Sequence, residues 1–409
     1  MSTTESAFNP RVASMQPSAT LAMSAKASEL RRAGKPVIAL SAGEPDFDTP
    51  APISAAGVEA IQSGFTNYTP NPGMPELREA ISEKFARENG LDYGSEQILC
   101  SNGAKQSVAL AIHVLCGPGD EVLIPAPHWV SYPEMTRFAG AEPVLAPTTA
   151  ESGYRLSPQQ LEEAITPDTR LLILCSPSNP TGAVYPPEEL EALAGVLRDY
   201  PQVQVLSDEI YEHVRFPGSE HVSFASLDGM KERTVTVNGF SKAFAMTGWR
   251  LGYLAAEPAV RDEAAKVQSQ FTSAPSSISQ KAGVAALQLM KDDPAPVHEM
   301  VGAFEERRDF VLDRLGELDV QCPTPGGAFY LFPDVSAYLG GDAPGGRSVE
   351  KSEDLCFYLL EEHHVALVPG GAFGAPSGLR LSYAASMEDL RTAMDRVSEG
   401  LGRLAKEVA

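Results

Sequence analysis

Short apolar runs that alternate with amphipathic segments are the feature that most constrains the fold of this chain. Helical patterns, such as those over 104–116 and 187–199, separate runs that are typical of buried strands. The clearest of these runs are 121–124, 170–175, 203–206 and 234–237. Nearly continuous apolar strands between helices indicate a largely parallel sheet that is covered on both faces. We therefore predict an α/β fold, with a three-layer large domain built on a largely parallel or mixed sheet and a smaller α/β domain.

The length of 409 residues is sufficient for two domains and a sizeable core. The chain starts with a polar stretch, continues into a helical pattern and a short strand-like run, and ends in a second α/β pattern after a long helical segment. We expect an arm, a small domain made from both ends of the chain, and a large domain between them. The predicted boundaries are 1–17 for the arm, 18–50 and 300–409 for the small domain, and 51–299 for the large domain.

The charge balance argues against two classes of partner. The chain has 32 Lys and Arg against 54 Asp and Glu, a formal net charge of −22, which disfavours nucleic acid and anionic membrane surfaces. Its five cysteines are scattered without metal-ligand spacing, so we expect reduced thiols and no metal. No run is long and apolar enough to span a membrane, and the N-terminus has no targeting pattern. We expect a cytoplasmic protein.

Polar loops follow three of the predicted strands. They cover residues 176–182, 207–211 and 239–242. Ligands of open α/β sheets bind at the carboxyl ends of the strands. Side chains from these three loops are therefore expected to meet in one crevice.

The third loop contains a lysine, and an arginine follows it eight residues later in the chain. Lys242 and Arg250 lie in the string from Ser241 to Tyr253, between a strand-like run and a second apolar run. A lysine at the edge of an apolar layer can lose its proton and form a Schiff base with a carbonyl. Arginine offers a rigid fork of donors that suits a phosphate. The alternative is a surface lysine and a structural arginine, but the pair is what a pyridoxal phosphate site requires.

This string closely resembles the signature around the cofactor lysine of the class I aminotransferases, which are fold-type I pyridoxal enzymes. The resemblance runs from about Pro17 to Tyr383 and is nearest to the branch of bacterial aspartate and prephenate aminotransferases. It implies that pyridoxal 5'-phosphate is the cofactor, that Lys242 is the catalytic residue and holds it, and that the substrates are small-molecule amino acids and 2-oxo acids. It also implies a homodimer with shared active sites.

The resemblance assigns further cofactor contacts to residues of the same motifs. Asp208 would face the pyridine nitrogen, although an aspartate at a strand end is otherwise often a cap. Asn179 and Tyr211 would hydrogen-bond the phenolic oxygen of the ring, with a plain turn as the alternative for Asn179. Trp129 would stack on the ring rather than serve only in the core.

The cofactor phosphate would lie at the start of the helix that begins near residue 104. Amides at a helix start attract anions, and the resemblance places the phosphate on the amides of Gly103 and Ala104, with Arg250 as its clamp. Tyr68 resembles a tyrosine that reaches the phosphate from the partner subunit. Many relatives have a serine three residues before the lysine, where this chain has Gly239.

The substrate contacts implied by the resemblance lie on other segments. Arg380 would bind the α-carboxylate through two parallel hydrogen bonds, and the Gly43 amide would close over the same group. Trp129 and Asn179 would also contact the substrate. Lys105 resembles the lysine that binds a distal carboxylate, although a solvated first-turn lysine is the simpler reading.

These residues predict transfer of an amine from aspartate to 2-oxoglutarate by a ping-pong mechanism. Prephenate transamination by aspartate or glutamate is the first alternative. The lysine that often precedes the motif starting at Pro17 is Gln16 here, which counts against prephenate.

Two readings from other classes stay open, and a third is disfavoured. A pyridoxal-dependent β-lyase could use the same cofactor site. A regulatory module would normally carry an added DNA-binding segment, and no basic helical segment is present. A hydrolase based on Ser241 is disfavoured because the string 239–243 ends in Ala where a nucleophile elbow has Gly.

Overall fold

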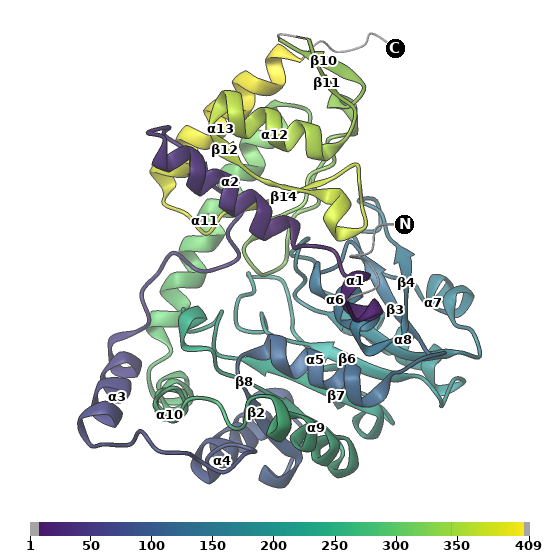
Figure 1. The fold of residues 1–409 in the computed structure, drawn as a ribbon, viewed down its shortest axis with the longest axis vertical. Coiled ribbons are helices and arrows are strands. Elements are labelled where there is room, and N and C mark those ends of the chain that lie inside the picture. Colours follow the sequence, from purple (N-terminus) through teal and green to yellow (C-terminus); the bar gives the residue numbers. More distant parts are fainter. Residues whose placement is uncertain (1–7, 345, 405–409) are drawn as a thin grey trace.

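The computed structural model describes residues 8–344 and 346–404, so 1–7 of the predicted arm and 405–409 lie outside the description. The large part of the molecule is organised by a seven-stranded sheet in the order β2–β8–β7–β6–β5–β3–β4 (Figure 1). Strand β8 is antiparallel to both of its neighbours, and the other pairs are parallel. The strands are β2 (Ile98–Ser101), β3 (Glu121–Ala126), β4 (Glu142–Pro147), β5 (Thr169–Cys175), β6 (Gln204–Asp208), β7 (Thr234–Gly239) and β8 (Gly252–Ala255). The predicted α/β class with a mixed sheet is confirmed.

Thirteen α-helices are present in the described residues. They are α1 (Pro10–Ala13), α2 (Ala19–Arg32), α3 (Ala51–Gln62), α4 (Pro75–Lys84), α5 (Ala104–Leu115), α6 (Ser131–Ala139), α7 (Pro158–Ala164), α8 (Pro187–Arg198), α9 (Pro258–Phe271), α10 (Ser277–Asp292), α11 (Ala295–Glu317), α12 (Ser352–His363) and α13 (Met387–Arg403). The short 3-10 and π turns are η2 (Phe85–Asn89), η3 (Ser95–Gln97), η4 (Phe224–Ser226), η5 (Lys231–Arg233), η6 (Thr247–Trp249), η7 (Ser336–Tyr338) and η8 (Gly370–Phe373).

Strand β5 shows why the sheet is covered on both faces. Leu171 and Ile173 pack into a core with residues of α5, α6 and α9, whereas Leu172 and Leu174 pack into a second core with residues of α7 and α8. Successive side chains of a strand point to opposite faces. A strand with no polar position along this stretch therefore needs helices on both sides.

The two ends of the chain share a separate core. Met23 of α2 and Val37 pack with residues of α11, α12 and α13. The strands here are β1 (Ile38–Ala39) paired with β12 (Val365–Ala366), the sheet β13 (Val368–Pro369), β14 (Leu379–Ser382) and β9 (Tyr330–Leu331), and the hairpin β10 (Gly341–Ala343) and β11 (Arg347–Val349). Helix α11 starts within the predicted large domain and runs to this second part (Figure 1). The predicted domain boundaries themselves stay a prediction.

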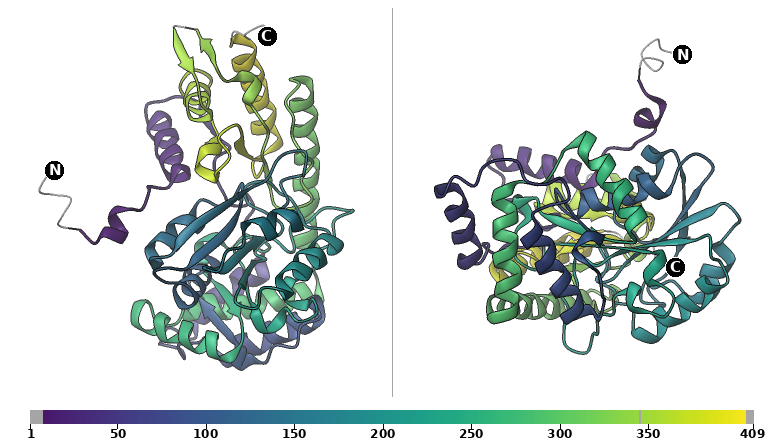
Figure 2. Two further views of the ribbon diagram at one scale, coloured as in Figure 1. Left: turned by 90° about the vertical axis from the view of Figure 1, so that its right-hand side faces the viewer. Right: turned by 90° about the horizontal axis from the view of Figure 1, so that it is seen from below.

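The N-terminal helix α1 extends from the body and touches α6 (Figure 2). The Gln16 amide donates to the Glu134 carboxylate of α6 at 2.8 Å. After this contact the chain turns into α2. Within residues 8–344 and 346–404, none of the helices has the length and apolar character of a membrane span.

Candidate active site

A cavity of about 590 Å³ lies where the carboxyl ends of β5, β6 and β7 meet the N-terminal segment and β14. Every predicted site residue except Gly103 and Tyr68 lines it. These residues are Gly43, Ala104, Lys105, Trp129, Asn179, Asp208, Tyr211, Lys242, Arg250 and Arg380. The register of the parallel strands explains part of this convergence, because Cys175 at the end of β5 pairs with Asp208 at the end of β6.

Lys242 lies in the loop that follows β7, and its side chain reaches into the cavity. Its amine donates to the carbonyl of Gly43 and lies 5.8 Å and 5.6 Å from the ring centroids of Tyr211 and Phe329. Burial, and next the charge of Arg380, lower the pKa of Lys242 to about 8. A lysine with this pKa is an uncharged amine in a sizeable fraction of molecules near neutral pH, so it can attack a carbonyl carbon or carry a proton.

Asp208 ends β6 and is buried. Its carboxylate accepts from the Tyr132 hydroxyl at 2.7 Å and from the Ile210 amide at 3.3 Å. Burial raises the pKa of Asp208 to about 6, and the hydrogen bond from Tyr132 opposes this rise. A cationic partner, such as the protonated nitrogen of a pyridine ring, stabilises the ionised form of a buried carboxylate with this pKa.

Arg380 is a buried guanidinium with no carboxylate partner among the described residues. It donates to Asn179 Oδ1 at 3.0 Å and to the Ser41 carbonyl at 2.8 Å, and its carbon lies 4.6 Å from the centroid of the Tyr330 ring. Its Nε–H is buried and has no hydrogen-bond partner in the part of the chain that the structure describes. Burial lowers the pKa of Arg380. An uncompensated buried cation with a free donor fits a carboxylate ligand.

The start of α5 forms a cradle beside Arg250. Gly103 has φ +84°, and a Cβ atom there would lie 2.5 Å from a guanidinium nitrogen of Arg250. The amides of Ala104 and Lys105 have no acceptor within the described part of the chain, as is usual for the first turn of a helix. The Gly103 amide, in contrast, already donates to the Ser101 carbonyl at 2.8 Å, so its predicted contact with the phosphate requires that bond to open. Free amides, a helix start and an arginine together fit a phosphate.

Lys105 lies in the first turn of α5, next to this cradle, and its side chain extends over the ring of Trp129. Its amine lies 4.9 Å from the centroid of the Trp129 ring. Burial, and then the nearby charge of Arg250, lower the pKa of Lys105. Lys105 lines the cavity beside Trp129 while the residue as a whole remains exposed, so its predicted contact with a distal carboxylate stays a prediction.

Tyr68 is 98% exposed and does not line the cavity. The predicted role of Tyr68 requires a second copy of the chain and stays a prediction. Gly239 lies in β7, where a Cβ atom would approach the Gly252 Cα to 3.0 Å. A serine at position 239 would therefore need the two strands to shift slightly.

Three residues of the site were not predicted from the sequence. Tyr132 donates to Asp208, Tyr330 is hydrogen-bonded through its hydroxyl to that of Tyr211 at 2.9 Å, and Glu44 lines the cavity and accepts from Thr247. Tyr132 lies three residues after Trp129, one turn further at the start of α6, which is the one sequence signal that could have identified it.

A buried ion pair stabilises the chain segment that follows Tyr211. Lys84 pairs with Glu212, and Glu212 also accepts from Asn238 Nδ2 at 2.7 Å. Glu212 follows Tyr211, and Asn238 precedes the lysine loop. Burial alone raises the pKa of Glu212, but Lys84 and two neighbouring histidines hold that pKa well below its usual range. Through the bond from Asn238, Glu212 connects the ends of β6 and β7, two of the strand ends that carry the site.

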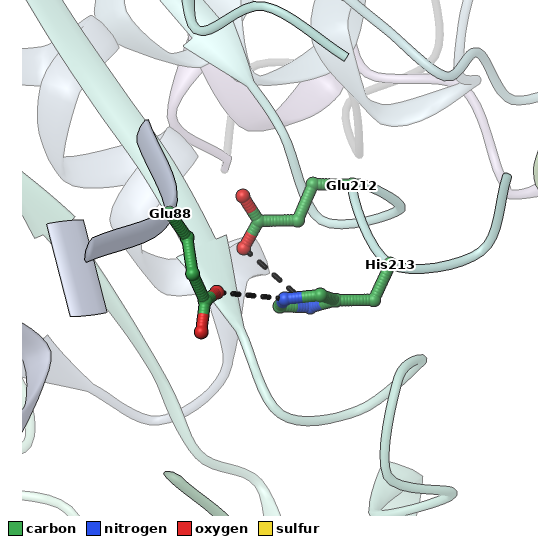
Figure 3. A group of neighbouring side chains, drawn as sticks. All are labelled: Glu88, Glu212 and His213. Carbon is green, nitrogen blue, oxygen red and sulfur yellow. Dashed lines mark hydrogen bonds and ion pairs between the residues drawn. The ribbon is translucent and has the colours of Figure 1, made fainter. Parts of the chain in front are cut away.

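Figure 3 shows the carboxylates of Glu88 and Glu212 both facing the imidazole ring of His213. These three residues place one potential ligand atom each within 4.8 Å of one another, a spacing that could hold a metal ion. The ammonium group of Lys84, however, pairs with Glu212 and lies 3.9 Å from Glu88. The cluster thus has a cation of its own.

Lys84→Met is expected to lower the free energy of unfolding by about 3–5 kcal/mol, because the Glu212 carboxylate would stay buried without its main partner. The measurement is urea unfolding at neutral pH, with Lys26→Met as the control. Lys26 pairs with Glu29 at the surface, and its loss should change stability by about 1 kcal/mol or less. The double variant Lys84→Met with Glu212→Leu should regain most of the loss. Equal small effects of both lysine variants would contradict this account.

Comparisons with known proteins agree with the geometry. The sequence matches the family model "Aminotransferase class I and II" over residues 35–397. It is 55% identical over 395 residues to the bifunctional aspartate aminotransferase and glutamate/aspartate-prephenate aminotransferase of Petunia hybrida, covering 96% of this chain and 82% of the relative. It is 46% identical over 405 residues to the aspartate aminotransferase of Rhizobium meliloti (strain 1021), covering 98% of both chains.

Two solved structures are similar over nearly the whole chain. The aspartate aminotransferase of Rhizobium meliloti superimposes with a TM-score of 0.93 at 45% identity, covering 97% of this chain and all of the other. The aspartate aminotransferase of Thermus thermophilus with maleate superimposes with a TM-score of 0.90, also at 45% identity, covering 96% and 99%.

Proposed function

The chain belongs to the class I and II aminotransferases, and on this premise we propose that it transfers the amine of aspartate to 2-oxoglutarate by a ping-pong mechanism. It is an aminotransferase that depends on pyridoxal phosphate. The observation that carries the substrate proposal is that two cationic side chains from different elements, Arg380 of β14 and Lys105 of α5, line the same cavity as Lys242. A dicarboxylic amino acid offers one carboxylate to each.

The names of relatives support this choice of substrate. The Rhizobium and Petunia proteins are named for aspartate, and the Thermus structure is one with maleate, which is a dicarboxylate. At 45–55% identity over nearly the full length, a shared substrate class is a reasonable expectation.

The residues present fit the cofactor. The free amides at the start of α5 and Arg250 would hold its phosphate, Trp129 would cover its ring, and Asp208 would pair with the ring nitrogen. When bound, pyridoxal phosphate supplies an aldehyde carbon for the amine and a ring that withdraws electrons from the substrate Cα. Everything else in the reaction is left to the side chains of the cavity.

The side chains of the cavity would bind the substrate, anchor the cofactor and transfer the proton. Arg380 orients the substrate through its α-carboxylate, with Asn179 holding the guanidinium in place. Lys242, whose pKa is lowered to about 8, anchors the cofactor in the resting enzyme and then moves the proton to and from the substrate Cα. Asp208 provides the negative charge that keeps the ring nitrogen protonated.

Prephenate transamination is the second candidate, and the name of the Petunia relative favours it. Prephenate also carries a distal carboxylate, so Lys105 suits it equally. Gln16 lies on the arm, outside the lining of the cavity in this structure, and offers no second cation.

The test is a pair of measurements on the purified protein with pyridoxal phosphate. Aspartate alone should convert the cofactor to its amine form, seen as a change of the absorbance spectrum, and 2-oxoglutarate should reverse the change. Pyruvate and ammonia formed from an amino acid without any oxo-acid acceptor would instead identify a β-lyase. Prephenate replaces 2-oxoglutarate in a parallel assay, and faster reversal by prephenate would favour the second candidate.

Lys105→Ser is expected to lower kcat/KM for aspartate by about ten- to a hundred-fold, because a charge-assisted hydrogen bond to the distal carboxylate is worth roughly 1.5–3 kcal/mol. Activity with alanine or phenylalanine should change little, since these donors keep the Arg380 contact. Lys291→Ser, at an exposed lysine, is the control for general effects. Equal losses with acidic and neutral donors would withdraw the dicarboxylate proposal and leave the aminotransferase assignment intact.

We also propose a homodimer with shared sites and a cytoplasmic location. A second, open cavity of about 660 Å³ adjoins the site, and Arg250 and Gly248 line both cavities. The exposed Tyr68 of another copy is a suitable occupant near Arg250. Sedimentation of the protein at the mass of one chain would contradict the proposed homodimer.

A further inference from the structure

We propose that Tyr132 is a positioning residue for amine transfer: its buried hydroxyl orients the Asp208 carboxylate and keeps it ionised. The inference rests on the role proposed above for Asp208 and adds the residue through which that role is maintained.

The geometry gives Tyr132 direct access to Asp208. Its hydroxyl donates to Asp208 Oδ2 at 2.7 Å, and only 2% of the residue is exposed. The other carboxylate oxygen accepts from the Ile210 amide at a longer 3.3 Å. Among the described residues, Tyr132 thus makes the shorter of the two hydrogen bonds that fix the direction of the carboxylate.

Tyr132 also contacts the aromatic residue proposed to cover the cofactor ring. Its ring meets that of Trp129 edge to face, with centroids 5.2 Å apart and an interplanar angle of 84°. Both residues come from one turn, at the start of α6. A substitution of Tyr132 can therefore act through its packing against Trp129 or through the charge of Asp208, and the experiment has to distinguish the two.

Titratable groups from several elements face Asp208. They are Tyr132 from α6, Cys175 from β5, Lys242 from the loop after β7, and the adjacent Glu209. Burial raises the pKa of both Tyr132 and Cys175 far above their usual ranges, so both keep their protons and Tyr132 can only donate to the carboxylate. A donor to the charged form lowers the pKa of an acid.

The hydrogen bond from Tyr132 lowers the pKa of Asp208. Asp208 has a pKa of about 6 with the Tyr132 bond in place. Without that bond the pKa rises, and more of the protein carries a neutral Asp208 near pH 6 to 7. At higher pH the carboxylate is restored and the defect shrinks, whereas a loss of packing would not depend on pH in this way.

The variant is Tyr132→Phe, which keeps the ring and removes only the hydroxyl. We expect the affinity of the cofactor-free protein for pyridoxal phosphate to fall about ten-fold near pH 6 and by less near pH 8. The rate of the aspartate half-reaction should fall about ten- to a hundred-fold at neutral pH. Tyr358→Phe is the matched control, because it removes a buried hydroxyl that donates to the Gly400 carbonyl, away from the cavity. It should leave affinity and rate unchanged.

A double-variant cycle with Asp208→Asn decides between charge and packing. If Tyr132 acts through the carboxylate, Tyr132→Phe should have little further effect on affinity in the Asp208→Asn protein. An equal loss in both backgrounds would overturn the inference in favour of packing against Trp129. Wild-type affinity and rate in Tyr132→Phe, with an impaired Asp208→Asn, would also overturn it. An unimpaired Asp208→Asn would instead refute the role proposed for Asp208.

Discussion

Lys242→Ala is expected to abolish transamination while the fold stays intact. The amine of Lys242 is held in the cavity by the Gly43 carbonyl, and burial with the charge of Arg380 lowers its pKa to about 8. In the proposed reaction one amine anchors the cofactor and also moves the proton at the substrate Cα. Loss of both tasks should reduce the rate by more than about a thousand-fold.

Two measurements check this result. The absorbance band of the lysine-bound cofactor should disappear from the variant, and the rate of amine transfer from aspartate should fall below detection. Lys266→Ala is the control, because Lys266 pairs with Glu263 on the surface of α9. Circular dichroism and thermal unfolding should show that both variants are folded. A Lys242→Ala protein with near-wild-type turnover would refute the assignment of the catalytic lysine.

Asp208→Ala is expected to leave cofactor binding measurable but to slow the aspartate half-reaction by roughly two or more powers of ten. The reason is electrostatic. Without the buried carboxylate, the ring nitrogen has no anionic partner at the end of β6, and the ring withdraws electrons from the substrate less effectively. The phosphate contacts at the start of α5 do not involve Asp208, so binding should be weakened rather than lost.

The competing explanation is that Asp208 only caps a turn, since it accepts from the Ile210 amide. Asp334→Ala is a matched control, because Asp334 accepts from the Ser336 amide at 2.8 Å in a similar local contact and does not line the cavity. Stopped-flow absorbance with aspartate measures both variants. A slowing of only a few-fold for Asp208→Ala, equal to that of the control, would show that Asp208 only caps a turn.

Much of the architecture follows from local sequence patterns. Apolar runs such as 170–175 predicted strands, and the adjacent helical patterns predicted two-sided cover, because burial on both faces removes the polar alternation of a half-exposed strand. The same patterns placed the loops carrying Asn179, Asp208 and Lys242 at strand ends. Parallel strands present those ends at one edge, so most of the predicted site residues line one cavity.

Other features depend on contacts between distant segments, which the local patterns did not identify. Strand β8 enters the sheet antiparallel between β2 and β7, and this choice is made by pairing rather than by its apolar sequence. Tyr132 and Asp208 are 76 positions apart, and Lys84 and Glu212 are 128 apart. The sequence shows only a tyrosine near a tryptophan and a lysine on an amphipathic helix.

The physical reason is that hydrogen bonds and ion pairs of buried groups act over a few ångströms. Periodicity and motif strings report which residues are buried and which loops are polar, because those properties act along the chain. They do not report which polar groups satisfy one another inside the protein, since that is settled when the elements pack. The sequence by itself therefore determined the class of fold and the cofactor, and it predicted Lys242 as the catalytic lysine. Only the tertiary structure decided which residues hold Asp208, Arg380 and Glu212 in place.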